Sequence, residues 1–372
     1  MTVRSKAVVR ALRRDVVAVL PAWCTARVLV LAGHAAAKIA VDHLHPTRPT
    51  NVHDGLLAWD GRFYQRIAES GYGSVPPEAR RFFPLFPWSG KAVALPLGGR
   101  EDLALLAIAN VLALVALVLF RRLVRRDAGP AAAERAVWLL AVFPTGFVLV
   151  WAYAEALYLA AAIGCLLWLR ERKWVLAAAA GGAAALTRPV GVLLVLAALI
   201  EARRGWGGAG GPERSRRLLA VAAPLAALGA YLGWCRWQFG DWLAAARVQQ
   251  DLRGDFVDPV TRLIRAAGDL MGSERFGDGL HFPFAVLFVV CLVVVARRLP
   301  ASYTAYAGAV LVISLGAENL NSLERYGLNA FPLVVGLALL TERGPFERPA
   351  LTACAGGLVG LTFLALLGAY VP

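Results

Sequence analysis

The sequence predicts an all-α integral membrane protein, and three features of its composition support this prediction. Of its 372 residues, 59% are hydrophobic and only 17% are charged, whereas soluble domains have about 45–50% apolar and about 25% charged residues. The apolar residues form long runs, as expected of helices that face lipid. Short basic clusters between these runs carry the net charge of +14, which is typical of membrane-protein loops. The composition therefore excludes a soluble enzyme, a disordered chain and a collagen-like fibre, and we expect no nucleic acid partner.

The membrane spans are predicted from the apolar runs, because a helix of about 20 residues crosses the bilayer core. We expect about eleven transmembrane helices (about 10–12) in a single polytopic domain over residues 1–372. The first span, from about Val16 to Val41, is too long for a cleaved signal peptide, so we expect an uncleaved helix. The spans are expected to begin near Val16, Leu103, Ala136, Ala154, Trp174, Pro189, Leu218, Phe282, Ser302, Gly327 and Ala350.

The basic residues orient these spans, because cytoplasmic loops carry more Lys and Arg. This rule predicts a multi-pass protein of the plasma membrane with a cytoplasmic N-terminus. Basic residues are dense in the predicted inner segments, which are 1–15, 121–135, 170–173, the Gly- and Arg-rich linker 201–217, 297–298 and 342–349. They are sparser in the predicted outer segments, which are the first outer loop 42–100, the second outer segment 239–281, and 318–326.

Three parts of the outer segments are predicted to lie at the membrane surface. In the first loop, apolar residues recur at roughly helical spacing over 59–72 while polar residues cover the other faces. Residues 82–98 are apolar but rich in proline, which predicts an interfacial or re-entrant segment rather than a full span. In the second segment, 241–253 is predicted to form a helix that acts as a lid or brace, with Gln249 and Gln250 available to sugar hydroxyls.

Charged residues from four separate turns are predicted to meet at the outer surface. Asp60, Glu155, Arg188 and Arg325 lie far apart in sequence, yet the predicted orientation places all four on the same side. Ionisable side chains are costly at membrane depth, so such a gathering favours a functional site. A single arginine beside apolar helices can instead reach lipid headgroups. Carboxylates together with arginines favour a substrate that joins a lipid to a phosphate and a hydroxylated group.

Six sequence pieces occur in a fixed order over residues 58–333. They are AWDGRFYQRIAESGY, FFPLFP, FPTGFVLVWAYAEALYL, LTRPVG, FGDWLAAARVQQ and SLERYGLNAFPL. Together they resemble the PIG-V family, the GPI-anchor mannosyltransferases and their bacterial relatives. The resemblance implies a GT-C type fold with an extracytoplasmic active site. It also implies a polyprenyl-phosphate-sugar donor as co-substrate and no cofactor.

Carried onto this sequence, the resemblance implies that Asp60 of the Trp-Asp pair is the catalytic carboxylate. In an inverting transfer a carboxylate takes the proton of the acceptor hydroxyl, while arginines bind the leaving phosphate. Arg325 is the first choice for the phosphate and Arg188 the second. Glu155 matches the family pattern, although Ala154 stands where serine is usual.

Further candidates lie near these residues. Tyr64, Arg66, His53 and Tyr326 are expected to line the donor or acceptor site, and Asp54 is the alternative general base. No metal is predicted, because the outer loops lack an acidic pair of DxD spacing and arginines can meet a single phosphate. The five cysteines lie in apolar segments without CxxC spacing, which predicts small buried side chains.

The function predicted from the sequence is transfer of mannose from polyprenyl-phosphate-mannose to an extracytoplasmic acceptor. The acceptor classes that stay open are a glycolipid, a lipoglycan and a protein. A membrane transporter or lipid flippase is one alternative, although it would place charges near mid-bilayer. A non-catalytic subunit of a glycosyltransferase complex is the other, because it would keep the fold without the chemistry.

Overall fold

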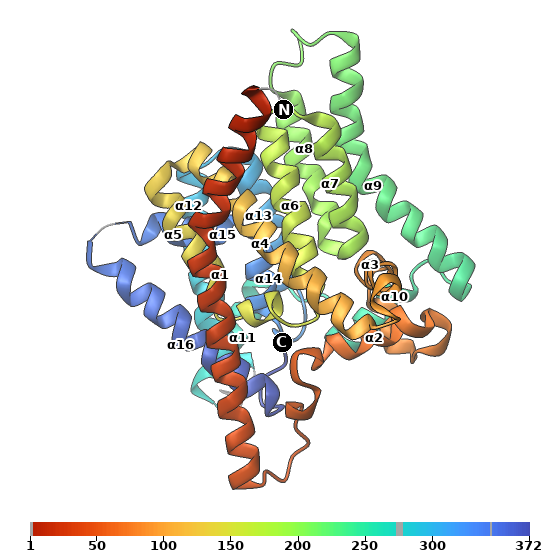
Figure 1. The fold of residues 1–372 in the computed structure, drawn as a ribbon, viewed down its shortest axis with the longest axis vertical. Helices are drawn as coiled ribbons and strands as arrows, with labels where there is room; N and C mark the ends of the chain where they lie inside the picture. The colour runs from red at the N-terminus through yellow and green to blue at the C-terminus, as the bar shows by residue number, and fades with distance from the viewer. Residues whose placement is uncertain (1–2, 273–277, 343) are drawn as a thin grey trace.

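The fold is helical in the parts of the chain that the computed structural model describes, which are residues 3–272, 278–342 and 344–372. Sixteen α-helices and eight short 3-10 helices follow one another there, with one isolated antiparallel bridge between Phe256 and Ala317. Figure 1 shows them as one bundle, with the start of the long helix α1 (Val3–Leu44) at the top. The all-α prediction is confirmed.

Five helical segments among the described residues are long and apolar enough to cross a membrane by themselves. Two further helices, α14 (Leu323–Asn329) and α15 (Pro332–Leu340), meet at 90° and form a sixth candidate as one broken span. The five long segments contain α1, α4 (Glu101–Ala128), α9 (Gly211–Phe239), α12 (Phe282–Arg298) and α16 (Glu347–Leu366). The chain is therefore a multi-pass membrane protein.

The remaining predicted spans correspond to shorter helices. They are α5 (Pro130–Ala141), α6 (Glu155–Arg170), α7 (Trp174–Thr187), α8 (Leu194–Arg203) and α13 (Ala301–Leu315). In α6, 12 of 16 residues are buried, because protein surrounds a helix that is apolar on every face. A helix lies near each predicted start, in agreement with the predicted count, but these five are too short to cross a core of ~30 Å unaided.

The third predicted span is interrupted after α5. Residues 142–154 follow an irregular and fully buried path that contains the 3-10 helix η5 (Gly146–Leu149). Pro144 lacks a backbone N–H, which disfavours a continuous helix there. The Asn110 side-chain amide donates to the Val150 carbonyl oxygen at 2.9 Å, since irregular backbone at this depth needs partners from the protein. This path ends at Glu155, the first residue of α6.

The segment predicted to be the first outer loop consists of short helices. Its amphipathic part forms α2 (Asp60–Ser70), which buries Tyr64 and Ile67. Residues 82–98 form the ten-residue helix α3 (Leu85–Ala94), which packs on α4 and α2 and agrees with a non-spanning segment. The loop also contains η1 (Val52–Leu57), η2 (Tyr72–Ser74), η3 (Pro77–Arg81) and η4 (Leu95–Leu97). The second outer segment contains α10 (Ala244–Arg253), α11 (Pro259–Met271) and η7 (Asp278–His281).

Four of the segments predicted to be inner, 1–15, 121–135, 170–173 and 201–217, meet at one end of the bundle. Arg121 bonds Asp15 at 2.6 Å, and Arg170 bonds Asp127 at 2.9 Å. The Gly-rich linker joins α8 to α9 at the top of Figure 1, at the same end as the start of α1. The short helices α2, α3 and α10 lie toward the opposite end in Figure 1. The two groups of segments are thus separated along the bundle, and the side of the membrane that each faces stays a prediction.

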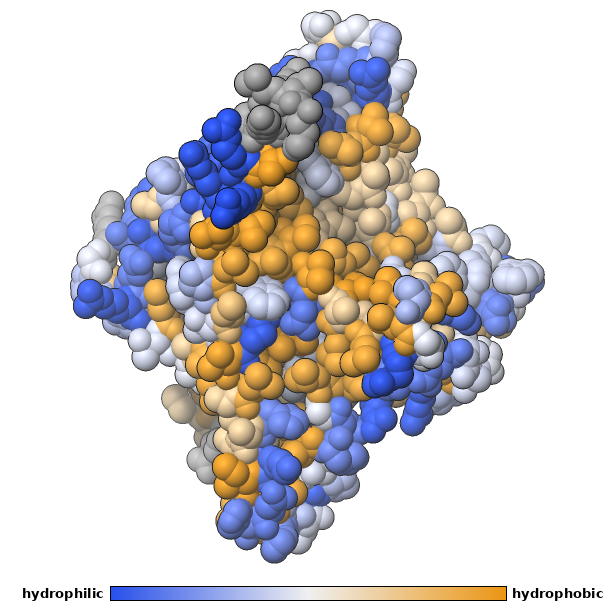
Figure 2. Space-filling view, viewed as in Figure 1, coloured by the Kyte–Doolittle hydropathy of each residue, from blue (hydrophilic) through white to orange (hydrophobic). Residues whose placement is uncertain are grey.

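The surface agrees with a membrane setting. Figure 2 shows hydrophobic side chains across the middle of this face, with hydrophilic ones toward the N-terminal end and toward the bottom. Exposed apolar residues include Val28 on α1, Val111 on α4 and Leu218 on α9. All five cysteines are free, and four are buried as predicted. Cys24 is exposed, because it lies on an outward face of α1, so its predicted burial was wrong.

Candidate active site

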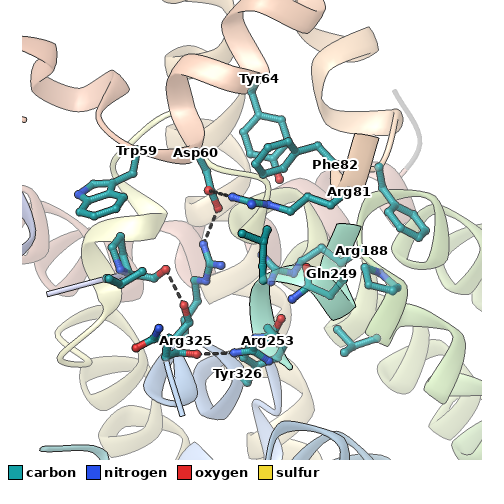
Figure 3. Close-up of a pocket in the computed structure, with 18 of the residues that line it drawn as sticks. Trp59, Asp60, Tyr64, Arg81, Phe82, Arg188, Gln249, Arg253, Arg325 and Tyr326 are labelled. Carbon is teal, nitrogen blue, oxygen red and sulfur yellow. Dashed lines mark hydrogen bonds and ion pairs between the residues drawn. The ribbon is translucent and has the colours of Figure 1, made fainter. Parts of the chain in front are cut away.

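A pocket of about 310 Å³ opens at the end of the bundle where the predicted outer segments gather (Figure 3). Its walls come from α2, α10, α14, the end of η3, and the turn between α7 and η6 (Pro189–Leu193). The C-terminal residues Val371 and Pro372 form a further part of the wall. Polar lining side chains include Asp60, Gln249, Asn319 and four arginines. The pocket thus combines segments that are far apart in sequence.

Asp60 is the first residue of α2, and its neighbours hold it at the pocket. Trp59 precedes it with φ of +57°, a left-handed conformation that costs a non-glycine residue about 1 kcal/mol or more. The Trp59 indole Nε1 donates to the Ala365 carbonyl oxygen at 2.8 Å. The Asp60 N–H donates to the Tyr153 hydroxyl at 3.2 Å. These two bonds turn the chain so that the Asp60 side chain lies in the pocket (Figure 3).

Carboxylates and arginines alternate across the pocket. Arg81 and Arg325 approach the Asp60 carboxylate at 3.3 and 2.7 Å (Figure 3). The Arg325 Nε lies 3.5 Å from the Glu155 carboxylate, and Arg188 forms a close ion pair with the same carboxylate. Glu155 is fully buried, and its second oxygen, Oε2, has no hydrogen-bond partner among the described residues. Arg325 therefore lies between the two carboxylates.

The electrostatic surroundings keep Asp60 ionised. Burial raises the pKa of its carboxyl group, but the charges of Arg325 and Arg81 and the hydrogen bond from Arg325 lower it further. The net result is a pKa below the usual value of 3.8. Asp60 can therefore accept a proton at neutral pH, but it is a weak base while both arginines contact it. A ligand that draws these arginines away would make it a stronger base.

A second group of side chains faces this centre from α10 and α14. The Arg253 guanidinium lies 4.5 Å from the centre of the Tyr326 ring, and that of Arg188 lies 5.7 Å from it. Arg253 also donates to the Asn321 carbonyl oxygen. Gln249, one turn before Arg253 on α10, lines the same wall (Figure 3). With Asp60, Glu155 and the four arginines counted together, the formal charge of the site is +2.

The structure brings together most of the residues predicted from the sequence. Asp60, Arg188 and Arg325 line the pocket, and Glu155 lies directly behind the two arginines. Tyr64 and Tyr326 also line it. Tyr64 packs edge-on against Phe86 with ring centres 4.9 Å apart, and burial raises the pKa of its hydroxyl group above its usual value. This phenol stays protonated and can donate a hydrogen bond.

Three predicted residues lie elsewhere. Arg66 is exposed on α2 and does not line the pocket. His53 is exposed as well, with its Nε2 3.4 Å from the Asp54 carboxylate. Asp54 forms a close ion pair with Arg62 and is not part of the pocket wall. The expectation that Arg66 and His53 line the site is wrong for this structure, because successive residues of a helix or turn point in different directions.

Sequence reasoning did not identify Arg81 and Arg253 as site residues. Arg81 belongs to the Arg-Arg pair before FFPLFP, and no local pattern distinguishes it from Arg80, whose guanidinium lies 5.0 Å from the Phe239 ring centre. Arg253 ends the predicted helix of the second outer segment. Gln249 lines the pocket, whereas Gln250 bonds Asp255 at 2.8 Å. Among the described residues, no three His, Cys, Asp or Glu side chains are grouped as metal ligands.

Comparison with known proteins shows similarity in structure. No family model matches the chain, and no curated protein sequence matches it. The structure is similar to ArnT from Cupriavidus metallidurans bound to undecaprenyl phosphate, with a TM-score of 0.51 and 15% identity over 82% of this chain and 71% of that chain. In its apo state ArnT gives a TM-score of 0.49 and 18% identity, over 80% of this chain and 56% of that chain.

The archaeal oligosaccharyltransferase AglB from Archaeoglobus fulgidus gives a TM-score of 0.44 and 13% identity. The match covers 93% of this chain and 56% of the AglB chain, so the present chain spans little more than half of that protein. The similarity to ArnT in complex with undecaprenyl phosphate shows the fold alone, given the low identity. The chain has the all-helical membrane fold of the GT-C type that the sequence predicted.

Proposed function

We propose that the protein is an inverting glycosyltransferase with a lipid-linked donor. It moves mannose from polyprenyl-phosphate-mannose to an acceptor at the outer surface of the plasma membrane. The acceptor is a glycolipid, a lipoglycan or a protein. The observation that carries the proposal is the pocket lined by Asp60 and four arginines, with Glu155 directly behind it, which together have a formal charge of +2.

The charges of this pocket match the change in the donor during transfer. The donor is a phosphodiester with one negative charge, and it leaves as a phosphomonoester with up to two. Arginine stays charged at all physiological pH values and binds phosphate oxygens through parallel hydrogen bonds. Arg325 and Arg188 are the first candidates for this contact, and Arg253 faces the same space. Their charge stabilises the leaving group most when its second charge develops.

Asp60 is the proposed general base. The acceptor hydroxyl oxygen forms a bond to the anomeric carbon, and the bond from that carbon to the phosphate oxygen breaks. The electron pair of the broken bond stays on the polyprenyl phosphate, and the hydroxyl proton goes to the Asp60 carboxylate. Attack opposite to the phosphate inverts the anomeric centre, so a β-linked donor gives an α-linked product. Negative charge from Asp60 and Glu155 also stabilises an oxocarbenium-like transition state.

Contact with phosphate activates this base. In the structure Arg325 binds the Asp60 carboxylate at 2.7 Å, and its charge lowers the pKa of Asp60. A donor phosphate competes for the same guanidinium. When Arg325 turns toward the phosphate, Asp60 loses part of the positive charge beside it and its basicity rises. Donor binding and base activation are therefore coupled through one arginine.

The structural comparison is compatible with this donor class. ArnT from Cupriavidus metallidurans, which has the same fold, was solved with undecaprenyl phosphate. A lipid phosphate of this kind is the product that the proposed reaction releases. The gathering of charged side chains at one end of the bundle also fits a transferase better than a transporter, whose ionisable groups are expected near mid-bilayer.

Transfer of radiolabelled mannose tests the proposal. Purified protein receives synthetic polyprenyl-phosphate-mannose and a crude lipid extract of its host, beside the Asp60→Asn variant. Wild type should form a labelled product, and Asp60→Asn should lose about 10²- to 10⁴-fold in rate, the usual contribution of a general base. Polyprenyl phosphates that carry other sugars, offered in the same assay, test the choice of mannose.

Two further variants sharpen the assignment. Asp54→Asn tests the alternative base, which lies outside the pocket wall. Asp102→Asn is the matched control, because its carboxylate pairs with the neighbouring Arg100 at 2.8 Å and lies outside the pocket wall. Loss of transfer in Asp54→Asn but not in Asp60→Asn would reassign the base. Absence of donor binding and of transfer in correctly folded wild type would favour a transporter or a non-catalytic subunit.

A further inference from the structure

A second charged cavity lies at the end of the bundle opposite to the pocket of Asp60. The helix α6 connects the two sites, since it begins at Glu155 and ends at Arg170. Its 16 residues span about 24 Å at ~1.5 Å per residue. The cavity has a volume of about 230 Å³. It is lined by Arg126, Leu169, Arg170, Arg172, Trp174, Glu201 and Arg204.

Glu201, which lines this cavity, and Asp127, which pairs with the lining Arg170, are already bonded to partners within the protein. Glu201 is buried, and it accepts hydrogen bonds from Ser302 at 2.6 Å and from Arg170 at 3.2 Å. Asp127 accepts from Arg170 at 2.9 Å and from the Tyr303 hydroxyl at 2.7 Å. These contacts tie together α4, α6, α8 and α13. The hydrogen bonds of the two carboxylates are thus directed to side chains of the protein.

The guanidinium groups retain donors that these carboxylates do not use. A guanidinium has five N–H donors, and among the described residues the Arg204 side chain donates only to Glu201, at 3.3 Å. Arg126 donates to the Arg170 carbonyl oxygen at 2.7 Å and lies 3.5 Å from Asp127. No hydrogen bond or ion pair of the Arg172 guanidinium is found within the described residues, although its charge acts on the nearby carboxylate of Glu213. Four arginines against Glu201 and Asp127 leave a formal charge of +2 around the cavity.

Buried contacts hold the walls of this cavity in place. Arg217, which is 1% exposed, donates to the carbonyl oxygens of Ala202 and Arg204 at 2.9 and 2.8 Å. Its guanidinium also lies 5.1 Å from the centre of the Trp174 ring. The backbone around Arg204 and the indole wall are therefore fixed to α9. Arg172 has φ of +57°, a left-handed conformation at a helix end where glycine is favoured, so an arginine stands there despite its energetic cost.

The surface beside the cavity is apolar. Val175 and Leu176, on the first turn of α7 next to Trp174, are 53% and 47% exposed. In a multi-pass membrane protein, exposed aliphatic side chains on such a helix face acyl chains. Trp174 itself is only 5% exposed, so its indole forms part of the cavity wall beside this apolar surface. The cavity therefore lies where a lipid headgroup and its acyl chains would be adjacent.

We propose that this cavity binds the phosphate group of an anionic lipid, with Arg126, Arg172 and Arg204 as its donors. The acyl chains lie along Val175 and Leu176. Arginine clusters between membrane helices are suited to anionic headgroups, and the planar guanidinium matches phosphate oxygens. The apolar surface favours a lipid over a soluble phosphate compound, which would use the same donors. The proposal does not depend on the proposed transferase activity, because it concerns the opposite end of the bundle.

Native mass spectrometry of the detergent-purified full chain tests the site, with phosphatidylglycerol and phosphatidylcholine as probes. The test variant is Arg172→Ala/Arg204→Ala, in which Glu201 keeps its bonds from Arg170 and Ser302. The matched control is Arg203→Ala/Arg216→Ala, which removes the same charge from exposed neighbours that do not line the cavity. At about fivefold per arginine, the test variant should bind phosphatidylglycerol about 25-fold more weakly than wild type.

The possible results separate the lipid from other sources of phosphate. The proposal is supported if wild type and the control variant retain phosphatidylglycerol but not phosphatidylcholine, and if the test variant loses phosphatidylglycerol. Equal losses in both variants overturn it, because general attraction to the basic surface would then explain binding. Inorganic phosphate is titrated alone as a second arm, with the melting temperature as readout. Inorganic phosphate could instead raise the melting temperature of wild type but not of the test variant, while phosphatidylglycerol is not retained. That result overturns the lipid proposal and assigns the arginine donors to a soluble phosphate compound.

Discussion

The Arg325 guanidinium on α14 lies 2.7 Å from the Asp60 carboxylate on α2, although 265 positions separate the two residues. The same guanidinium lies 3.5 Å from Glu155 at the start of α6. One arginine thus connects the amphipathic helix α2 to the buried centre of the bundle. Any change that moves α14 or alters the charge on Asp60 should therefore affect the whole pocket.

Replacing Arg81 should change the pH dependence of transfer. Arg81 is one of the charges that lower the pKa of Asp60 below 3.8, so Arg81→Ala should raise that pKa and shift the acidic limb of the rate profile to higher pH. Arg80→Ala is the control, since Arg80 lies over Phe239 instead. The measurement is kcat/KM against pH. Identical acidic limbs in wild type and Arg81→Ala would contradict the prediction.

The same shift has a consequence for stability. The pKa of Asp60 is lower in the folded protein than its usual 3.8, so ionised Asp60 stabilises the fold at pH values above 3.8. This contribution should be lost as the pH falls through the lowered pKa. Between pH 7 and pH 5, Asp60 should add no pH dependence to the melting temperature. Plots of melting temperature against pH for wild type and Asp60→Asn should therefore run parallel across this range.

Glu155→Gln should destabilise the protein strongly. Glu155 is fully buried and pairs with Arg188, so its neutralisation leaves a buried guanidinium without its partner. Such a change costs about 3–5 kcal/mol in the free energy of unfolding. Glu69→Gln is the control, because Glu69 is exposed and accepts a hydrogen bond from the neutral side chain of Gln65. Thermal unfolding in detergent measures both, and equal melting temperatures would show that the buried pair contributes little.

Gly327→Ala should displace α14 and reduce activity. A Cβ atom at Gly327 would lie 2.1 Å from the buried Phe288 ring of α12, so either the ring or α14, which carries Arg325, must move. Gly356→Ala in α16 meets nothing within 4 Å and should be neutral or stabilising by up to about 1 kcal/mol. Melting temperature and transfer rate are measured for both. If Gly327→Ala matched Gly356→Ala, close packing of α14 on Phe288 would be ruled out.

Tyr370→Phe should lower the free energy of unfolding more than the same substitution at Tyr158 does. The Tyr370 hydroxyl donates at 2.9 Å to Glu324, whose other oxygen lies 2.7 Å from His281, and all three side chains are buried. Loss of a hydrogen bond to a charged group costs about 1.5–3 kcal/mol, against about 0.5–1.5 for a neutral pair. Tyr158→Phe is the neutral control, since Tyr158 bonds the Tyr306 hydroxyl. Equal unfolding free energies in the two variants would contradict the prediction that the hydrogen bond to Glu324 is the stronger of the two.

Arg253→Ala should weaken donor binding more than it slows the chemical step. Arg253 lines the pocket beside Tyr326 but does not contact Asp60. An interaction that is equal in the ground state and the transition state raises KM and leaves kcat unchanged when lost. Arg247→Ala on the same helix is the control, because Arg247 is exposed and pairs with Asp241 at 3.1 Å. A fall in kcat at constant KM would place Arg253 at the reacting atoms instead.

The amino-acid sequence by itself determined the membrane class, the helices and the separation of charged segments into two ends. Hydrophobic runs and helical periodicity are local properties, so α2 and α10 could be predicted where they occur. The gathering of Asp60, Glu155, Arg188 and Arg325 could also be predicted, because topology alone assigns each turn to one end.

Only the tertiary structure decided which neighbouring side chain enters the pocket. Arg81 lines it and Arg80 does not, and the same is true of Gln249 and Gln250. The buried irregular path over 142–154 and the 90° bend between α14 and α15 also escaped the sequence pattern. These features depend on contacts between different segments of the chain, as in the pair of Asp60 and Arg325. Adjacent residues differ there only in the direction of their side chains, which packing against distant helices determines.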